Sequence, residues 1–123
     1  FGDNYYIEVQ YHGIPEQKMI LPHQIAIASE LDIPIVATND VHYVNALDWQ
    51  LHDIHIQMRN INDENMKANG KKEAYSSHQF FLKTQEEMSK MFGKLGNAMT
   101  NTLEIAGKVD DFLNLNVPHL LPS

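Results

Sequence analysis

The sequence predicts an α/β fold in which two parallel strands are joined by a helix and followed by a mainly helical extension. The stretch 5–10 (Tyr-Tyr-Ile-Glu-Val-Gln) alternates and is rich in β-forming residues, which is typical of a strand. The stretch 35–38 (Ile-Val-Ala-Thr) is a short apolar run between Pro34 and Asn39, which is typical of a buried parallel strand. Helical spacing of apolar residues between them completes a βαβ unit, whose strands should be parallel and whose crossover should be right-handed.

The joining helix is predicted at 22–31. Pro22 suits the first helical position, where its missing N–H costs no hydrogen bond, and residues 15–19 are expected to form a looser turn. The helix should end before Pro34, because the residue that precedes a proline is pushed out of the α region. The apolar face of this helix is expected to comprise Ile20, Ile25, Ile27, Ala28 and Leu31.

A second helix is predicted at 46–60, with Asn45 as its N-cap. His52 and His55 lie on it three residues apart, which is a spacing that can bind metal, but helical zinc motifs usually add a further ligand at a set distance. We therefore interpret His52 as a packing or hydrogen-bonding residue and His55 as an exposed one. The expected apolar face comprises Leu47, Leu51, Ile54, Met58 and Ile61.

The rest of the chain is predicted to be a polar loop followed by helices. The stretch 62–77 has few large apolar residues and should be a surface loop or linker. A short strand is expected at 80–82, and Thr84 with Glu87 forms the capping-box pattern that starts a helix. A last helix is expected at 98–109. The apolar candidates on these two helices are Met88, Met91 and Phe92, and then Ala98, Leu103, Ile105, Ala106 and Val109.

Composition excludes several classes of site. The 123 residues include no cysteine, so there is neither a disulfide framework nor a thiolate metal site, which fits a cytoplasmic location. No run approaches the ~20 apolar residues of a membrane helix, and no signal peptide is visible. The formal net charge is −7 and Arg59 is the single arginine, so we do not expect this segment to bind nucleic acid strongly by itself. Phe1 opens the chain close to a strand, and we expect the sequence to be a piece of a longer protein.

Polar side chains begin where the strand at 35–38 ends. Asp40 and His42 are two residues apart, so in an extended segment both project to the same side, where a carboxylate and an imidazole can ligate Zn²⁺, Mn²⁺ or iron. Such a pair alone is a weak signal, because short Asp/His spacings commonly cap turns. Asn39 and His12, which lies just past the first strand, could line the same mouth. A solvent-exposed loop histidine is at least as good an interpretation of His12.

Five motifs together resemble one family. They are Tyr-Ile-Glu-Val-Gln-x-His-Gly-Ile-Pro-Glu-Gln at 6–17, Ala-Thr-Asn-Asp-Val-His-Tyr at 37–43, His-Asp at 52–53, Phe-Leu-Lys-x-x-Glu-Glu-Met at 81–88 and Asn-Thr-Leu-Glu-Ile-Ala at 101–106. In this order and spacing the sequence resembles the polymerase-and-histidinol-phosphatase (PHP) domain of the C-family replicative polymerases of bacteria, the alpha subunits of DNA polymerase III.

The resemblance implies a distorted (β/α)7 barrel whose mouth holds divalent metals (Zn, Mn or Fe), and it places the family's Asp-x-His motif on Asp40 and His42. The remaining ligands would come from earlier strands that are not among these residues. Residues 1–61 would be the closing portion of the barrel, 62–79 a polar loop, and 80–123 a helical extension that leads toward the polymerase palm. The Mg²⁺ site for nucleotidyl transfer would lie beyond residue 123.

The longer protein implied by the resemblance, called the parent below, would be a DNA-directed DNA polymerase that binds DNA, dNTPs and other replisome subunits. Its PHP domain could hydrolyse phosphoesters, as in 3′→5′ proofreading. The segment alone is expected to be inactive, and its open sheet edge could pair with a second copy to form a dimer. Two alternatives stay open. One is a stand-alone PHP phosphatase that depends on metal, and the other is a non-catalytic structural or docking domain.

Overall fold

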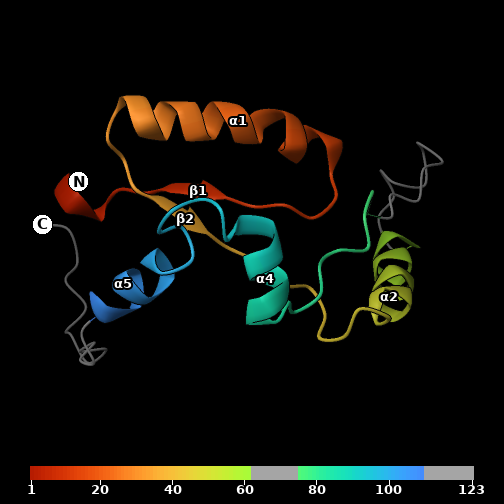
Figure 1. The fold of residues 1–123 in the computed structure, drawn as a ribbon. Coiled ribbons are helices and arrows are strands. Elements are labelled where there is room, and N and C mark those ends of the chain that lie inside the picture. Colours follow the sequence, from red (N-terminus) through yellow and green to blue (C-terminus); the bar gives the residue numbers. More distant parts are fainter. Residues whose placement is uncertain (62–74, 110–123) are drawn as a thin grey trace, which may run out of the picture.

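The computed structural model describes residues 1–61 and 75–109 as an α/β arrangement of two strands and four α-helices (Figure 1). After a short 3₁₀ turn, the strands and helices follow one another along the chain. They are β1 (Ile7–Val9), α1 (Pro15–Glu30), β2 (Ile35–Ala37), α2 (Trp49–Ile61), α4 (Gln85–Phe92) and α5 (Asn101–Gly107). The expected loop at 62–77 and the tail after 109 lie largely outside the described residues.

β1 and β2 pair in parallel, as the sequence predicts, and Ile7 lies opposite Ile35. Each strand is three residues long, which is shorter than expected. The expected strand at 80–82 is reduced to one parallel bridge between Tyr43 and Phe81. The α/β class and the parallel βαβ unit are therefore confirmed. The complete PHP barrel and the division at residues 61 and 79 stay predictions.

The helix that joins the two strands starts earlier than predicted. It runs from Pro15 to Glu30 and contains Pro22 in its interior. Pro15 takes the first helical position, where a proline costs nothing. In the same first turn, the Gln17 side chain accepts a hydrogen bond from the His12 backbone N–H at 2.7 Å. These anchors favour helix from residue 15, although Pro22 removes one backbone hydrogen bond from the next turn. Of the predicted apolar face, only Ala28 is fully buried.

The core lies between the strand pair and the helices that follow in the second half of the chain (Figure 1). Val9, Ala37, Phe92 and Ala98 form one buried cluster. The backbone N–H of Ala37 donates to Ala98 O at 2.9 Å, and Asn101 Nδ2 donates to Ile35 O at 2.8 Å. The outer edge of β2 is thereby closed by the connection between α4 and α5.

Helix α5 is shorter than the predicted 98–109, since it begins at Asn101 and ends at Gly107. The reason is the sheet contact just described. In a longer helix the Ala98 carbonyl would accept from the backbone N–H four residues on, but here it accepts from Ala37. Ala98 is buried, whereas the predicted apolar residues Leu103 and Val109 are exposed.

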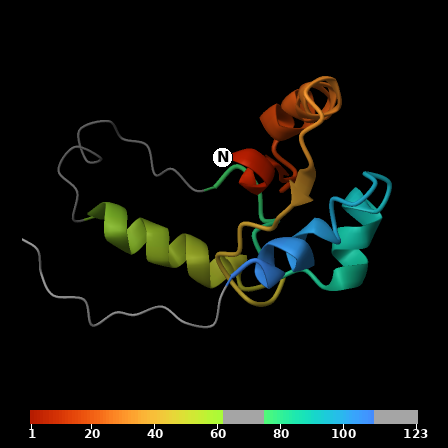
Figure 2. The ribbon, with the colours of Figure 1, turned by 90° about the vertical axis from the view of Figure 1, so that its left-hand side faces the viewer.

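Helix α2 begins at Trp49 instead of 46, and Asn45 is not its cap. Both the backbone N–H and Nδ2 of Asn45 donate to Asp48 Oδ2, at 2.8 and 2.9 Å, which folds residues 45–48 into a separate turn. Figure 2 shows α2 standing away from the strand pair. Most of its predicted apolar face is exposed in the described structure, with exposed fractions of 76% for Leu47, 69% for Leu51, 53% for Ile54 and 61% for Met58.

The predicted capping box at the start of α4 is present. Thr84 Oγ1 accepts from the Glu87 backbone N–H at 3.2 Å, and Glu87 Oε2 accepts from the Thr84 N–H at 2.8 Å. The second of these bonds stabilises the ionised carboxylate and holds the pKa of Glu87 below its ordinary value of 4.5. The carboxylate therefore favours the folded state at neutral pH, and this contribution disappears as the pH falls through the lowered pKa.

Replacing Thr84 by Ala should lower the free energy of unfolding by about 1 kcal/mol, because the first turn of α4 loses its cap.

Glu87→Gln should make stability less sensitive to acid below pH 4.5, since the variant has no carboxylate to protonate. Urea unfolding at neutral and acidic pH measures both effects. A Glu87→Gln variant that loses stability in acid as steeply as the original chain would contradict the link to Glu87.

Candidate functional site

Asp40 and His42 lie in the segment that follows β2 at its carboxyl end. Their side chains meet, with Asp40 Oδ2 at 3.1 Å from His42 Nε2. Both side chains remain accessible, with exposed fractions of 50% for Asp40 and 28% for His42. A carboxylate and an imidazole in this arrangement offer two donors of the kind that zinc, manganese and iron accept. Within residues 1–61 and 75–109, no cluster of three or more such donors occurs.

His12 is a buried residue, so its interpretation as a solvent-exposed loop histidine is wrong. Only 1% of it is exposed, and its ring stacks on Phe80 with 4.7 Å between centroids. Its Nε2 lies 3.2 Å from Asn39 Oδ1 and 3.1 Å from the backbone N of Asp40. The structure therefore brings His12 and Asn39, the two predicted site-lining residues, next to Asp40.

Two further residues join this group, and we did not single them out from the sequence. Gln17, in the first turn of α1, places its Nε2 3.2 Å from His12 Nδ1. Lys83 is only 9% exposed, and its Nζ lies 3.3 Å from Asn39 Oδ1 and donates to the Gln79 carbonyl. The one signal for Gln17 is its place in the Pro-Glu-Gln motif. Lys83 has a signal of the same kind, since it is the lysine of the Phe-Leu-Lys motif at 81–88.

Burial lowers the pKa of both His12 and Lys83. Desolvation, aided by the nearby Lys83 cation, holds the pKa of His12 below its ordinary value of 6.5. The pKa of Lys83 is also lowered by burial. His12 is therefore a neutral imidazole at neutral pH, and one of its ring nitrogens carries a proton while the other accepts a hydrogen bond.

The other side of His42 is aromatic. Its ring lies 5.3 Å from His52, 5.0 Å from Tyr75 and 5.2 Å from Phe80, measured between centroids. His52 is half-buried among these rings, in agreement with its interpretation as a packing residue, and His55 is exposed as expected. The cluster leaves the His42 imidazole held between Asp40 and three other rings, which limits the orientations that it can take.

Comparison with known proteins identifies relatives. The DNA polymerase III subunit alpha of Borreliella burgdorferi is 37% identical over 91% of this chain and 10% of its own length. The proteins of that name from Campylobacter jejuni and Treponema pallidum are each 36% identical, over 96% and 99% of the chain and 10% of their own lengths.

The chain thus spans about a tenth of the length of the curated relatives it matches. No family model matches the sequence. No helix among the described residues is long and apolar enough to span a bilayer. The chain is homologous, over nearly its whole length, to one segment of the bacterial DNA polymerase III alpha subunits.

Proposed function

We propose that this chain is the closing portion of the PHP domain of a replicative DNA-directed DNA polymerase, the alpha subunit of DNA polymerase III. The observation that carries the proposal is the contact between Asp40 and His42 at the carboxyl end of β2. In parallel α/β folds the groups that do chemistry collect at this end of the strands. The relatives support the parent family, since all those compared bear the name of this subunit.

In the intact PHP domain, Asp40 and His42 would hold a divalent metal (Zn²⁺, Mn²⁺ or iron) together with ligands from other parts of the parent. The donor types fit such an ion, but two donors fall short of the three that a catalytic site usually needs. The chemistry that the metal supplies is activation of water for attack on a phosphoester. His42 would contribute a neutral ring nitrogen, and Asp40 would contribute negative charge.

The parent would carry out nucleotidyl transfer at a separate Mg²⁺ site outside these 123 residues, and it would bind DNA, dNTPs and other replisome subunits. The chain alone should have neither polymerase nor phosphoesterase activity. Its net charge of −7 also opposes strong binding to a phosphate backbone. A non-catalytic structural PHP domain is the second candidate, in which the 3.1 Å contact between Asp40 Oδ2 and His42 Nε2 would order the turn after β2 without a metal.

The gene sequence on either side of this segment tests the family proposal. We expect a His-x-His segment upstream, where the earlier barrel strands would lie, and a polymerase palm downstream. A short gene that encodes a PHP domain without a palm would favour the stand-alone phosphatase. The non-catalytic candidate predicts the same palm but upstream strands that have lost their metal ligands.

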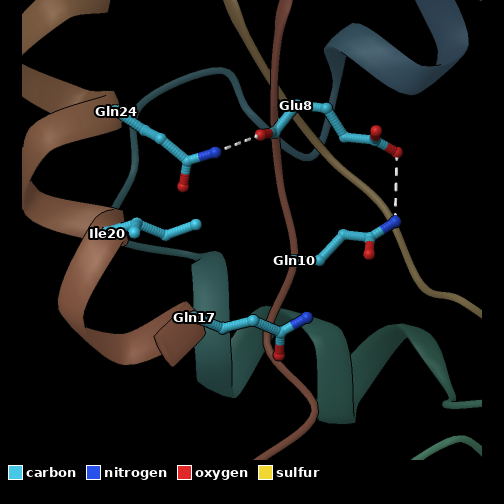
Figure 3. Close-up of a pocket in the computed structure, with 5 residues that line it drawn as sticks. All are labelled: Glu8, Gln10, Gln17, Ile20 and Gln24. Carbon is cyan, nitrogen blue, oxygen red and sulfur yellow. Dashed lines mark hydrogen bonds between the residues drawn. The ribbon is translucent and has the colours of Figure 1, made fainter. Parts of the chain in front are cut away.

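The outer edge of β1, which faces away from β2, is a candidate surface for pairing with a second copy of the chain. Ile7 and Val9 use their backbone groups to pair with Pro34 and Thr38, so the backbone of Glu8 faces away from β2. Figure 3 shows the polar pocket along this edge, in which Gln24 Nε2 donates to the Glu8 carbonyl at 3.0 Å. One acceptor of the edge is thus covered by a side chain of α1. We propose that a second copy can displace this contact and pair with β1.

Light scattering of the purified chain should then show a dimer, and Glu8→Pro should shift the mass to that of a monomer. A proline at this position removes an outward-facing N–H without removing a hydrogen bond between β1 and β2. Gln10→Ala, one residue past the end of β1, is a control that should leave the dimer intact. A monomer for the original chain would count against edge pairing, as would a dimer that survives the proline.

A further inference from the structure

His12 connects four separate segments of the chain. It follows β1, and its ring nitrogens face Gln17 on α1 and Asn39 beyond β2. Its ring stacks on Phe80, and its carbonyl accepts a hydrogen bond from Ser77 Oγ. A buried polar side chain with this many partners is costly unless its donors and acceptors are matched. The need to pair each donor with an acceptor therefore limits the tautomer of His12 and the orientations of the Gln17 and Asn39 amides.

The amide of Asn39 can be oriented from its partners. Its Nδ2 lies 3.0 Å from the Phe81 carbonyl, which can only accept, so Nδ2 donates there. Its Oδ1 then faces both Lys83 Nζ and His12 Nε2, at 3.3 and 3.2 Å. Because Lys83 can only donate and Oδ1 can only accept, the contact with His12 is satisfied when Nε2 carries the proton.

The amide of Gln17 leads to the same assignment. Its Oε1 accepts from the His12 backbone N–H at 2.7 Å, which leaves Nε2 to donate to His12 Nδ1 at 3.2 Å. Nδ1 must then be without a proton. The opposite tautomer would accept from the Asp40 backbone N–H, which lies 3.1 Å from Nε2 and has no acceptor there in the Nε2–H tautomer. It would, however, set acceptor against acceptor at Asn39 and donor against donor at Gln17. The contacts with the Asn39 and Gln17 side chains therefore favour the Nε2–H tautomer, and only the contact with the Asp40 backbone favours the other.

We propose that His12 is a positioning residue for the candidate metal site. As the Nε2–H tautomer selected by Gln17, it holds Asn39 and thereby sets the path of the segment that carries Asp40 and His42. The inference rests on the proposed function in taking Asp40 and His42 as the site. It does not place His12 in contact with a metal, since both of its ring nitrogens already have protein partners.

The first measurement is the tautomer of His12 in the chain without metal, from the ¹⁵N signals of its imidazole. We expect a protonated Nε2 and a bare Nδ1. The second measurement compares two variants through the Asp40 amide signal and the His42 ring signals. His12→Gln keeps an N–H donor near the position of Nε2 and should leave these signals close to those of the original chain. His12→Phe keeps the stacking on Phe80 but has no donor, and it should shift them.

His55→Phe is the matched control, because His55 is an exposed histidine on α2 and its replacement should shift neither set of signals. A protonated Nδ1 in the original chain would overturn the proposal, as would a folded His12→Phe variant with unshifted Asp40 and His42 signals. If His12→Phe does not fold, His12→Gln decides. Signals that stay in place support the proposal, and signals that shift overturn it.

A metal titration separates this proposal from the proposed function. In the intact parent, His12→Phe should weaken Mn²⁺ binding by about 10-fold or more, in the range found when residues behind a metal ligand are replaced. His12→Gln should weaken it less. Absence of Mn²⁺ binding to the original parent would contradict the metal site, whereas the tautomer and the shifts in the metal-free chain would still decide whether His12 positions Asp40 and His42.

Discussion

Replacing Phe92 by Ala is expected to lower the free energy of unfolding by about 3–5 kcal/mol. Phe92 is 1% exposed and lies in the cluster with Val9, Ala37 and Ala98, so it joins the end of α4 to both strands. Removing its ring leaves a cavity between the two halves of the fold. Alanine has the highest helix propensity, so the loss would come from packing and not from a weaker α4.

Urea unfolding followed by circular dichroism measures this loss. Phe1→Ala is the matched control, because the side chain of Phe1 is fully exposed and its removal should change stability by less than about 0.5 kcal/mol. If Phe92→Ala were as stable as this control, α4 would not be packed on the strands as described. The segment from residue 80 would then be a separate extension, as the sequence resemblance alone suggests.

The features that the sequence predicts well depend on neighbours in the chain. The capping box needs only Thr84 and Glu87, three residues apart, and it is present. The parallel pairing follows from two short β-rich runs separated by a helix. Antiparallel hairpins are joined by short loops, whereas a helical connection is typical of parallel strands. In both cases the sequence pattern is compatible with few other structures.

Helix ends were predicted less well because distant partners decide them. The start of α1 depends on Pro15 and on the bond from the His12 backbone to Gln17, whereas Pro22 alone suggests a later start. The start of α5 depends on Ala98, whose carbonyl is taken by Ala37, a residue 61 positions earlier in the chain. No window of sequence around Ala98 contains that information.

Burial of a polar side chain is equally non-local. His12 is followed by a glycine in a loop, a context in which an exposed histidine is common. Its burial comes from Phe80, which stacks on the ring, and from Asn39, which lies 27 residues away. The apolar spacing of α2 gives the converse case. It correctly predicts a helix, but the apolar face is exposed, because none of the described segments covers Leu51, Ile54 or Met58.

In the intact parent, the double variant Asp40→Asn with His42→Ala should lose its bound metal at this site. Asp40 Oδ2 and His42 Nε2 are 3.1 Å apart, so one ion could contact both once their mutual hydrogen bond is given up. Replacing residues behind a ligand typically weakens metal affinity by about 10–100-fold, and losing two ligands should cost more than that. Titration with Mn²⁺ or Zn²⁺ and measurement of bound metal would show the loss.

The control removes the same types of side chain elsewhere. His23→Ala with Glu30→Gln deletes an exposed imidazole and an exposed carboxylate from α1, and it should leave metal content unchanged. Unchanged metal content in the Asp40 and His42 variant would remove both residues as ligands. The contact between them would then be a hydrogen bond that orders the turn after β2, and the parent would hold its metal with residues outside this segment or function without one.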